Sequence, residues 1–383
     1  MNKKLGYYSI GVQTFESKIK ACVQASKIVK DLDLPVRPRD LVKWHFNDEI
    51  FDHYNWTIEP EESLQNLYYQ RAKHIREHYD YVILSYSGGA DSHNALMSFL
   101  DQGLHVDELV VTHMNKAMDK YAIVDPNHKE SKYSYSSEYY LQISPRLRDI
   151  HNRMPSIKIT ILDVSDSVFE AFAKHRDESW IFHVREELNP VDASRYNYLQ
   201  FPSFKKQLDL DKKICIVLGV DKPKVRYDNT TNKFYFSFVD RLANITPIGE
   251  YAKDYTNTTI EYFYWSPDAC DLLCKQAHTI ANHIISNPHL KSCFLPTIYT
   301  NYERTLVPLL YAGIWDSSWF QADKSNYDWY SEYDHWFLER HRNSIEYSLW
   351  NKGLQYIYKN CSDFVIPHGA LRRFDKKYEF KNG

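Results

Sequence analysis

The sequence predicts an α/β fold, in which a doubly wound parallel sheet is followed by a mostly helical, aromatic-rich C-terminal region. Short runs that are almost entirely apolar alternate with segments of helical periodicity along the middle of the chain. Runs that are apolar on both faces are typical of strands covered by helices on both sides, and right-handed crossovers join such strands into one sheet. The predicted strands are residues 81–87, 108–114, 157–164 and 213–220.

The segments around these strands complete the expected topology. Residues 61–79 carry apolar side chains at helical spacing, and a second helix from Asp91 to Gln102 should end at Gly103. Further helical stretches are expected at about 136–152, 166–178 and 194–209.

The remaining segments define the ends of the proposed domains. Residues 224–240 predict a β-hairpin, and a clear helix should begin near Pro267 with Ser266 or Asp268 as its cap. Another helix is expected from Glu16 to Leu32. We therefore divide the chain into an N-terminal helical or irregular extension at 1–60, a nucleotide-binding domain at 61–245 and a helical region at 246–383.

Composition narrows the classes of protein. The 47 basic and 50 acidic residues give a net charge of −3, so net charge does not indicate a nucleic-acid partner. No apolar run approaches the length of a membrane span, and the first residues lack an apolar signal segment, so we expect neither membrane insertion nor secretion. The six cysteines are then expected to be free thiols in a cytoplasmic protein.

Cys270 and Cys274 are the only closely spaced cysteines. In a helix they would share one face with His278, because residues four apart lie above one another. With Cys293 as a fourth ligand this face could bind a metal ion, whereas buried helix cysteines are the commoner outcome. The sequence leaves both interpretations open.

The strongest functional signal lies in residues 81–100, where two glycines stand together in a chain with only 11 glycines. Glycines let the backbone approach a phosphate, and the N–H groups at a helix start form an anion site. Here a loop joins the first predicted strand to its helix, and it is neither a GxxxxGK[ST] nor a GxGxxG motif. A tight turn without a ligand is the alternative. The candidate phosphate-binding residues are Ser87, Gly88, Gly89, Ala90, Asp91 and Ser92.

The loop sequence SGGADS resembles the SGGxDS signature of the PP-loop ATP pyrophosphatase superfamily, whose domain has the HUP (adenine nucleotide α-hydrolase-like) fold. GMP synthetase, asparagine synthetase and tRNA lysidine synthetase are members. The resemblance covers about residues 81–240. It implies that the loop binds ATP with Mg²⁺, that Asp91 is a metal ligand, and that the enzyme releases pyrophosphate while it adenylates a substrate.

The resemblance also implies contacts at the end of the second predicted strand. There the family cradles adenine, which makes Thr112 and His113 candidate nucleotide contacts. For His113 a satisfied loop histidine is the alternative. Asp163 ends the third predicted strand and is either a metal or ribose ligand or, more simply, a loop cap.

A basic loop follows the fourth predicted strand. Lys222, Lys224 and Arg226 resemble the cationic loop of the reductase-like branch of the family, whose side chains face phosphates. Such cations would neutralise charge on the triphosphate and in the transition state. We expect Lys222 to act with Asp91 in catalysis, while a solvated basic turn is the alternative.

Residues 260–273 also resemble the phosphoadenylyl-sulfate reductase-like branch, in which a Trp and an Asp begin a helix after the sheet. The reductase reaction, however, uses a cysteine near the C-terminus in an ECGLH-like context. Here the last cysteine, Cys361, stands in NCSDF. We therefore expect reductase-like architecture without sulfonucleotide reductase activity.

The C-terminal part adds two further expectations. Residues 311–350 are rich in Trp and Tyr with acidic residues between them, which favours a helical core or a surface for a protein partner or a second copy over a nucleic-acid platform. The basic tail, 372–383, is expected to be solvated, with a local phosphate contact as the alternative.

Three functions follow from these patterns. The first is an ATP pyrophosphatase-type ligase or transferase acting on a small molecule or nucleotide. The second is a nucleotide-binding protein without turnover, and the third is an interaction protein that uses its aromatic half.

Overall fold

The centre of the protein is a five-stranded, all-parallel sheet in the order β10-β7-β4-β5-β6. Its strands are β4 (Tyr81–Ser85), β5 (Glu108–His113), β6 (Lys158–Asp163), β7 (Ile214–Leu218) and β10 (Thr258–Tyr262). The computed structural model describes residues 6–116, 125, 127, 135–166, 169–170, 172, 177–184, 188–190, 202–240, 257–287, 289–290, 302–311, 313–314, 316, 332–366 and 369–383. Among these residues, no helix has the length and apolarity that a membrane crossing needs.

The four predicted strands are confirmed, and so is their parallel arrangement. β4 is the middle strand, with β5 and β7 as its neighbours, and its residues Tyr81 to Ser85 are in register with Ile214 to Leu218. The fifth strand, β10, was not predicted. It is short, contains three polar residues in five and lies at an edge of the sheet, so it lacks the continuous apolar run of a central strand.

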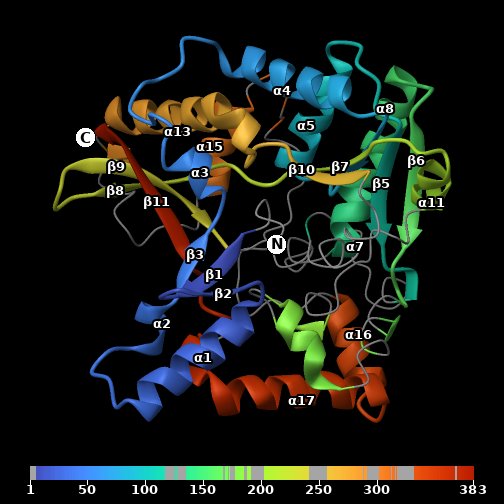
Figure 1. Cartoon of the computed structure of the whole chain (residues 1–383). Helices are drawn as coiled ribbons and strands as arrows, with labels where there is room; N and C mark the ends of the chain where they lie inside the picture. The colour runs from blue at the N-terminus through green and yellow to red at the C-terminus, as the bar shows by residue number, and fades with distance from the viewer. Residues whose placement is uncertain are drawn as a thin grey trace.

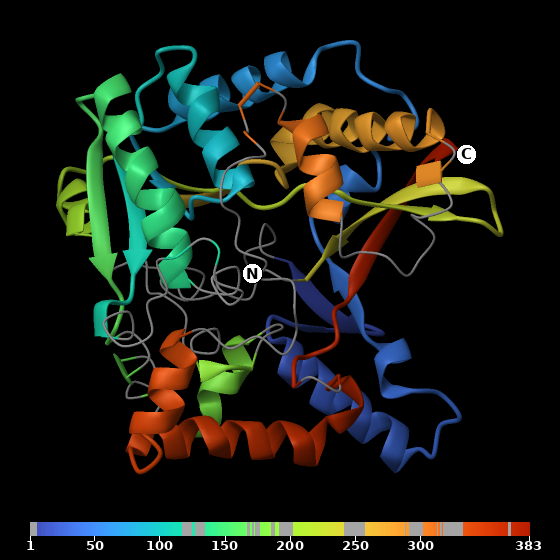
Figure 2. The same cartoon turned by 180° about the vertical axis from the view of Figure 1, so that it is seen from behind.

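Helices connect and cover these strands (Figure 1). The predicted helices at 61–79 and 91–102 are confirmed as α4 (Leu64–His78) and α5 (Ala90–Leu100), and Gly103 follows α5 with a φ of 67°. Both views place α8 beside β5 and β6 (Figure 2). The crossover segments contain α7 (Tyr135–Glu138), the π-helical turn η3 (Tyr139–Ile143), α8 (Ser144–Arg153), the 3-10 helix η4 (Glu178–His183) and α11 (Pro202–Asp209).

A second sheet joins the predicted hairpin to the end of the chain. β8 (Lys224–Asp228) and β9 (Lys233–Val239) pair antiparallel as expected, and β11 (Asp375–Asn382) adds to β9. The prediction of a solvated tail is therefore wrong. Tyr378 and Phe380 alternate with charged residues along β11 and are buried, a pattern of period two that the charge count of the tail concealed.

The N-terminal segment also contains a sheet, which the expected helical or irregular extension did not include. β1 (Tyr7–Ile10) pairs antiparallel with β2 (Gln13–Phe15) and with β3 (Lys43–His45). These strands have only three or four residues, too few for a pattern to be detected in the sequence. The predicted helix is present as α1 (Lys18–Asp31), and the short helices α2 (Pro38–Leu41) and α3 (Asp48–Phe51) flank β3.

The C-terminal part consists mainly of helices, as expected. The 3-10 turn η7 (Pro267–Ala269) leads into α13 (Cys270–Ile285), and Ser266 caps this turn by accepting a hydrogen bond from the N–H of Asp268. Of the aromatic-rich stretch at 311–350, residues 312, 315 and 317–331 lie outside the described part of the chain. The other elements are α15 (Tyr302–Leu310), α16 (Glu332–Arg340), α17 (Ile345–Asn360) and the 3-10 turn η9 (Ser362–Phe364).

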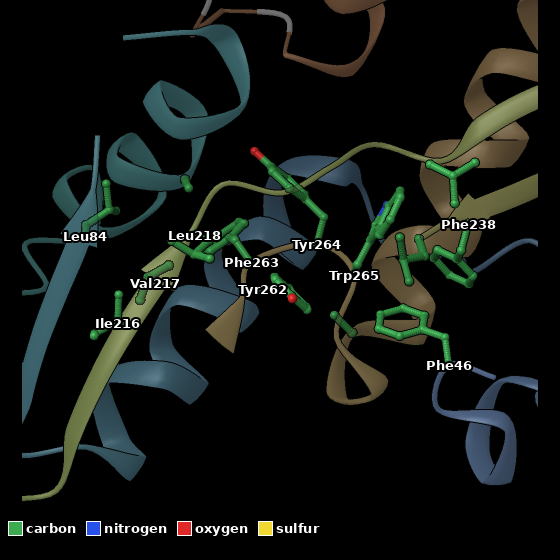
Figure 3. Close-up of a cluster of buried hydrophobic side chains, with 14 of the residues drawn as sticks. Phe46, Leu84, Ile216, Val217, Leu218, Phe238, Tyr262, Phe263, Tyr264 and Trp265 are labelled. Carbon is green, nitrogen blue, oxygen red and sulfur yellow. The ribbon is translucent and has the colours of Figure 1, made fainter. Parts of the chain in front are cut away.

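Aromatic side chains connect the five-stranded sheet to the rest of the core. The chain leaves β10 at Tyr262 and places Trp265 against Phe46 and Phe238, with ring centroids 6.2 and 5.1 Å apart. Figure 3 shows this cluster next to apolar residues of β4 and β7 such as Leu84. The segment after β10 is thereby fixed close to the ends of the central strands, where the candidate site lies.

Candidate functional site

The predicted phosphate loop lies between β4 and α5, as the sequence suggested. Gly88 has a φ of 73°, a conformation that residues with a Cβ rarely adopt. A Cβ built on Gly88 would also overlap the side chain of Ile143. The turn therefore requires glycine at this position for two independent reasons.

Two serines close the loop on itself. The hydroxyl of Ser92 lies 3.1 Å from that of Ser87 and donates to the carbonyl of Gly89 at 3.2 Å. The backbone N–H of Ser87 donates in turn to Ser92 Oγ at 3.3 Å. These bonds hold the first turn of α5, whose N-terminal N–H groups form the kind of positive end that binds anions.

The loop after β7 lies directly against the phosphate loop. A Cβ on Gly219 would come within 2.7 Å of the N and Cα atoms of Ser92, so the two backbones meet at a distance that only glycine permits. The chain runs from β4 to β5 and β6 on one side, and then continues to β7 on the other side of β4. This is the topological switch point, at which open parallel sheets bind their ligands.

Asp91 and Lys222 meet at this point. The ammonium group of Lys222 lies 3.2 Å from Asp91 Oδ2, and its side chain is only 2% exposed, whereas Asp91 is 26% exposed. Oδ1 of Asp221 lies 3.7 Å from the same ammonium group. The prediction placed Asp91 and Lys222 together in one site, and the structure brings them into contact.

Two tyrosines form hydrogen bonds with Asp91. Tyr311 donates a hydrogen bond to Asp91 Oδ1, and Tyr264 donates to the backbone carbonyl of Asp91 at 2.9 Å. Asn94 donates to the Tyr264 hydroxyl at 2.8 Å. Burial, followed by the charge of Asp91, raises the pKa of Tyr311 well above its ordinary value, so this phenol stays a proton donor to the carboxylate.

Two side chains from the segment between β5 and β6 donate hydrogen bonds to the carbonyl of Gly88. Gln142, in the π-helical turn η3, donates to it, and Arg146 of α8 donates to it at 2.6 Å. Both side chains are buried, and burial lowers the pKa of Arg146. Short π-helical turns are frequent at functional sites because they redirect side chains by one position.

No sequence pattern predicted these supporting residues as part of the site. Gly219 stands near the end of the predicted strand 213–220, and a glycine inside a strand is a signal for close backbone approach. Tyr311 and Tyr264 lie far along the chain in regions rich in aromatics, and no local pattern distinguishes them from core residues. The same holds for Gln142 and Arg146.

The other predicted site residues lie on β5 and β8. Thr112 and His113 are at the carboxyl end of β5, as expected, and the ring of His113 lies 4.1 Å from that of Tyr139. Lys224 forms an ion pair with Asp221 at 3.2 Å, beside the Lys222 pair. Arg226 lies within β8, opposite Tyr235, and so belongs to the second sheet.

Asp163 has the cap role that the sequence favoured. Its Oδ1 accepts hydrogen bonds from the N–H of Ser165 at 3.0 Å and from the N–H of Asn115 at 3.3 Å. Burial alone would raise the pKa of Asp163, but these hydrogen bonds outweigh it and hold the pKa below its ordinary value. The carboxylate therefore joins the loops that follow β5 and β6.

The alternative metal site on α13 finds no support in the described residues. Cys274 donates to the carbonyl of Trp56 at 3.4 Å, and His278 Nε2 lies 3.0 Å from the same carbonyl. Within the part of the chain described, no three His, Cys, Asp or Glu side chains are grouped as metal ligands. Cys293 lies outside this part.

The structure thus defines a protein with a parallel α/β sheet and a glycine-containing strand-to-helix loop at its switch point. Comparison with protein-family models and with curated protein sequences finds no match to this chain.

Proposed function

We propose that this protein is a HUP-type ATP pyrophosphatase, which binds Mg-ATP at residues Ser87 to Ser92 and adenylates a substrate. The observation that carries the proposal is the contact between Gly219 and Ser92, which joins two glycine-containing loops at the switch point of the sheet. A phosphate-binding loop needs this close backbone approach and free space for an anion at the helix start. The SGGADS resemblance supports the same ligand.

The donor set fits a magnesium nucleotide. Magnesium is usually held by one or two carboxylates together with the phosphates of its substrate, and Asp91 supplies a partly exposed carboxylate at the loop. When bound, the ion polarises the phosphates and neutralises charge on the departing pyrophosphate. In this proposal, Lys222 contributes a second positive charge from a fixed position.

In this proposal, some residues of the site bind the phosphates and others hold the loop in position. The N–H groups of the α5 start bind the phosphates, while Gln142 and Arg146 fix the carbonyl of Gly88 so that the loop keeps its shape. Tyr311 orients the carboxylate of Asp91. A preorganised site of this kind lowers the cost of stabilising charge in the transition state.

One observation favours a nucleotide-binding protein without turnover as a second candidate. Both carboxylate oxygens of Asp91 already have partners, because Oδ1 accepts from Tyr311 and Oδ2 lies beside Lys222. A metal ion must compete with these contacts. Both candidate functions include the same nucleotide contacts. In each, Thr112 and His113 would contact adenine, and Lys224 and Arg226 would contact the phosphates.

The buried free thiols support a reducing compartment, so we place the function in the cytoplasm. Cys22, Cys215, Cys270, Cys274 and Cys361 are all free and buried. Disulfides are the usual state of paired cysteines in oxidising compartments.

The test uses Mg-ATP, calorimetry and chromatography of the products. We expect binding by wild type and, in the presence of a substrate, AMP and pyrophosphate as products. Gly88→Ala should abolish binding, because the added Cβ overlaps Ile143 in a backbone conformation that disfavours it.

Gly103→Ala is the matched control, since Gly103 has a φ of 67° but nothing within 4 Å of its Cβ position. It carries the backbone strain without a clash at the loop. Unchanged ATP affinity in a folded Gly88→Ala protein would contradict the phosphate-loop assignment. Formation of ADP would contradict the pyrophosphatase class, and binding without any product would favour the second candidate.

A further inference from the structure

A serine, a histidine and an aspartate form a hydrogen-bonded chain in the N-terminal sheet. The hydroxyl of Ser9 lies 2.8 Å from Nε2 of His45, and Nδ1 of the same ring lies 2.6 Å from Oδ2 of Asp48. Ser9 is in β1, His45 ends β3 and Asp48 begins α3. Ser9 and His45 thus lie in the three-stranded N-terminal sheet, whereas the candidate phosphate loop follows β4 of the five-stranded sheet.

The pairing of β1 with β3 brings Ser9 and His45 together. Ser9 is opposite Lys43, and Tyr7 is opposite His45, so all four side chains leave the same face of the sheet. The ring of Tyr7 stacks on that of His45 with centroids 4.6 Å apart and planes at 13°. This stacking restricts rotation of the imidazole and keeps Nε2 directed at Ser9.

Asp48 is itself held in place. Its Oδ1 accepts a hydrogen bond from the N–H of Phe46 at 2.8 Å and contacts the ammonium group of Lys376. Burial alone would raise the pKa of Asp48, but the hydrogen bonds from Lys376 and His45 outweigh it and hold the pKa below its ordinary value. The carboxylate is therefore ionised at neutral pH and accepts hydrogen bonds only.

The ionised carboxylate fixes the tautomer of His45. Because Asp48 can only accept, Nδ1 carries the proton, and Nε2 of the neutral ring then has a lone pair that can accept from the Ser9 hydroxyl. A nucleophile bonded to a base, which is bonded in turn to an orienting acid, is the arrangement that activates serine for acyl transfer.

The hydrogen-bonded triad of Ser9, His45 and Asp48 is partly exposed to solvent. Ser9 as a residue is 8% exposed, but the ring of His45 is 24% exposed, and the two cross-strand neighbours of Ser9, Thr14 and Lys43, are both exposed. Directly opposed residues have Cβ atoms about 5 Å apart, so the ammonium group of Lys43 can reach charge that develops beside Ser9. Among the residues that the structure describes, Lys43 forms no ion pair.

We propose that Ser9 is the nucleophile of a second, esterase-type site, with His45 as general base, Asp48 as positioning residue and small activated esters as substrates. The Ser9 oxygen attacks the carbonyl carbon while Nε2 of His45 takes the hydroxyl proton. The intermediate collapses, the bond to the alcohol oxygen breaks, and that oxygen takes the proton from Nε2. Water then attacks the acyl-serine in the same way and releases the carboxylic acid.

Elsewhere in the protein, a serine, a histidine and an aspartate are arranged in the same order at longer distances. This second group serves as a matched control. Ser156 Oγ lies 3.5 Å from Nδ1 of His105, and Nε2 of His105 lies 3.6 Å from Oδ1 of Asp107. Both distances exceed those of a good hydrogen bond, and Asp107 is already bound to Arg76 at 2.6 Å. Ser156 should therefore be unreactive.

The test treats the full-length protein with a fluorophosphonate, which loses fluoride when a serine oxygen attacks its phosphorus, and maps the label by mass spectrometry. We expect the label on Ser9 and none on Ser156. His45→Ala should slow labelling about 100-fold, the usual order for loss of a general base, whereas His105→Ala should have no effect. Far-UV circular dichroism and thermal melting show that each variant is folded.

Turnover is measured with p-nitrophenyl acetate. Ser9→Ala should reduce hydrolysis to the rate of the uncatalysed reaction. Asp48→Asn should lower kcat at least about tenfold with KM unchanged, because Asp48 acts on the tautomer of His45 and not on the substrate. Absence of label on folded wild type, a label elsewhere than Ser9, or labelling that does not depend on His45 would each overturn the proposal.

Discussion

The ammonium group of Lys222 lies 3.2 Å from the carboxylate of Asp91, although 131 residues separate the two in sequence. The pair joins the start of α5 to the loop after β7, on either side of the sheet's switch point. Because the lysine side chain is almost completely buried, the loss of either charge should destabilise the site.

Removal of the negative charge of Asp91 should destabilise the protein, because the buried Lys222 ammonium loses a carboxylate contact at 3.2 Å. We expect Asp91→Asn to lower the free energy of unfolding by about 2 kcal/mol, less than for a fully buried pair because Asp91 is 26% exposed. The double variant Asp91→Asn, Lys222→Met should recover part of this loss. Urea denaturation measures all three proteins.

The exposed pair of Lys116 and Asp166 provides the control for this experiment. Its side chains are 50% and 62% exposed, so Lys116→Met should change the free energy of unfolding by less than about 0.5 kcal/mol. If Asp91→Asn costs no more than Lys116→Met, the buried pair does not stabilise the site.

Gly219→Ala should disturb the site by steric contact alone. The added methyl group would lie 2.7 Å from backbone atoms of Ser92, which cannot move aside without displacing the start of α5. We expect a loss of about 1–3 kcal/mol in stability together with weaker ATP binding. Gly89→Ala is the comparison, since its Cβ would meet only Ser87 Oγ at 3.5 Å. Equal melting temperatures for the two variants would refute the close-approach argument.

His93 should make the protein less stable in acid. Burial, aided by the charges of Arg146 and Arg153, lowers the pKa of His93 from 6.5 to about 3. The unfolded chain therefore takes up a proton below about pH 6.5, while the folded chain does not until near pH 3. His93 therefore does not lower the free energy of unfolding above pH 6.5. As the pH falls from 6.5 towards 3, the free energy of unfolding decreases by at most about 1.4 kcal/mol per pH unit.

His93→Gln removes this titration and keeps a side chain that can accept a hydrogen bond from Tyr86, whose hydroxyl lies 2.9 Å from Nδ1 of His93. Urea denaturation between pH 7 and pH 4 should show a smaller loss of stability for the variant than for wild type. Parallel pH profiles would show that His93 already titrates normally in the folded protein.

Cys361→Ser should leave nucleotide binding and product formation unchanged. Cys361 is 1% exposed, and burial together with the charge of Asp363 raises the pKa of its thiol to about 12, so it is not a thiolate nucleophile at neutral pH. We also expect no sulfite release from adenylyl-sulfate substrates. A sulfite-forming activity that disappears in Cys361→Ser would overturn the exclusion of reductase chemistry.

How far the sequence predicts the fold depends on the length of each element. Four strands of the parallel sheet, β4 to β7, and the helices α4 and α5 were predicted because each carries a pattern over five or more residues. β1, β2 and β3 were missed because three or four residues contain no measurable period. β11 was missed for a different reason, since its alternating Tyr378 and Phe380 lie in a segment that was interpreted by its charge.

The sequence by itself determined the parallel sheet, the Gly88–Gly89 turn and the presence of Asp91 and Lys222 at the carboxyl ends of strands, because hydrophobic period and glycine position are local properties of a chain. Only the tertiary structure decided that Tyr311 reaches Asp91, that Arg146 holds the Gly88 carbonyl and that Ser9 lies against His45. These contacts join distant segments, and they are set by how helices and strands pack, which no local pattern records.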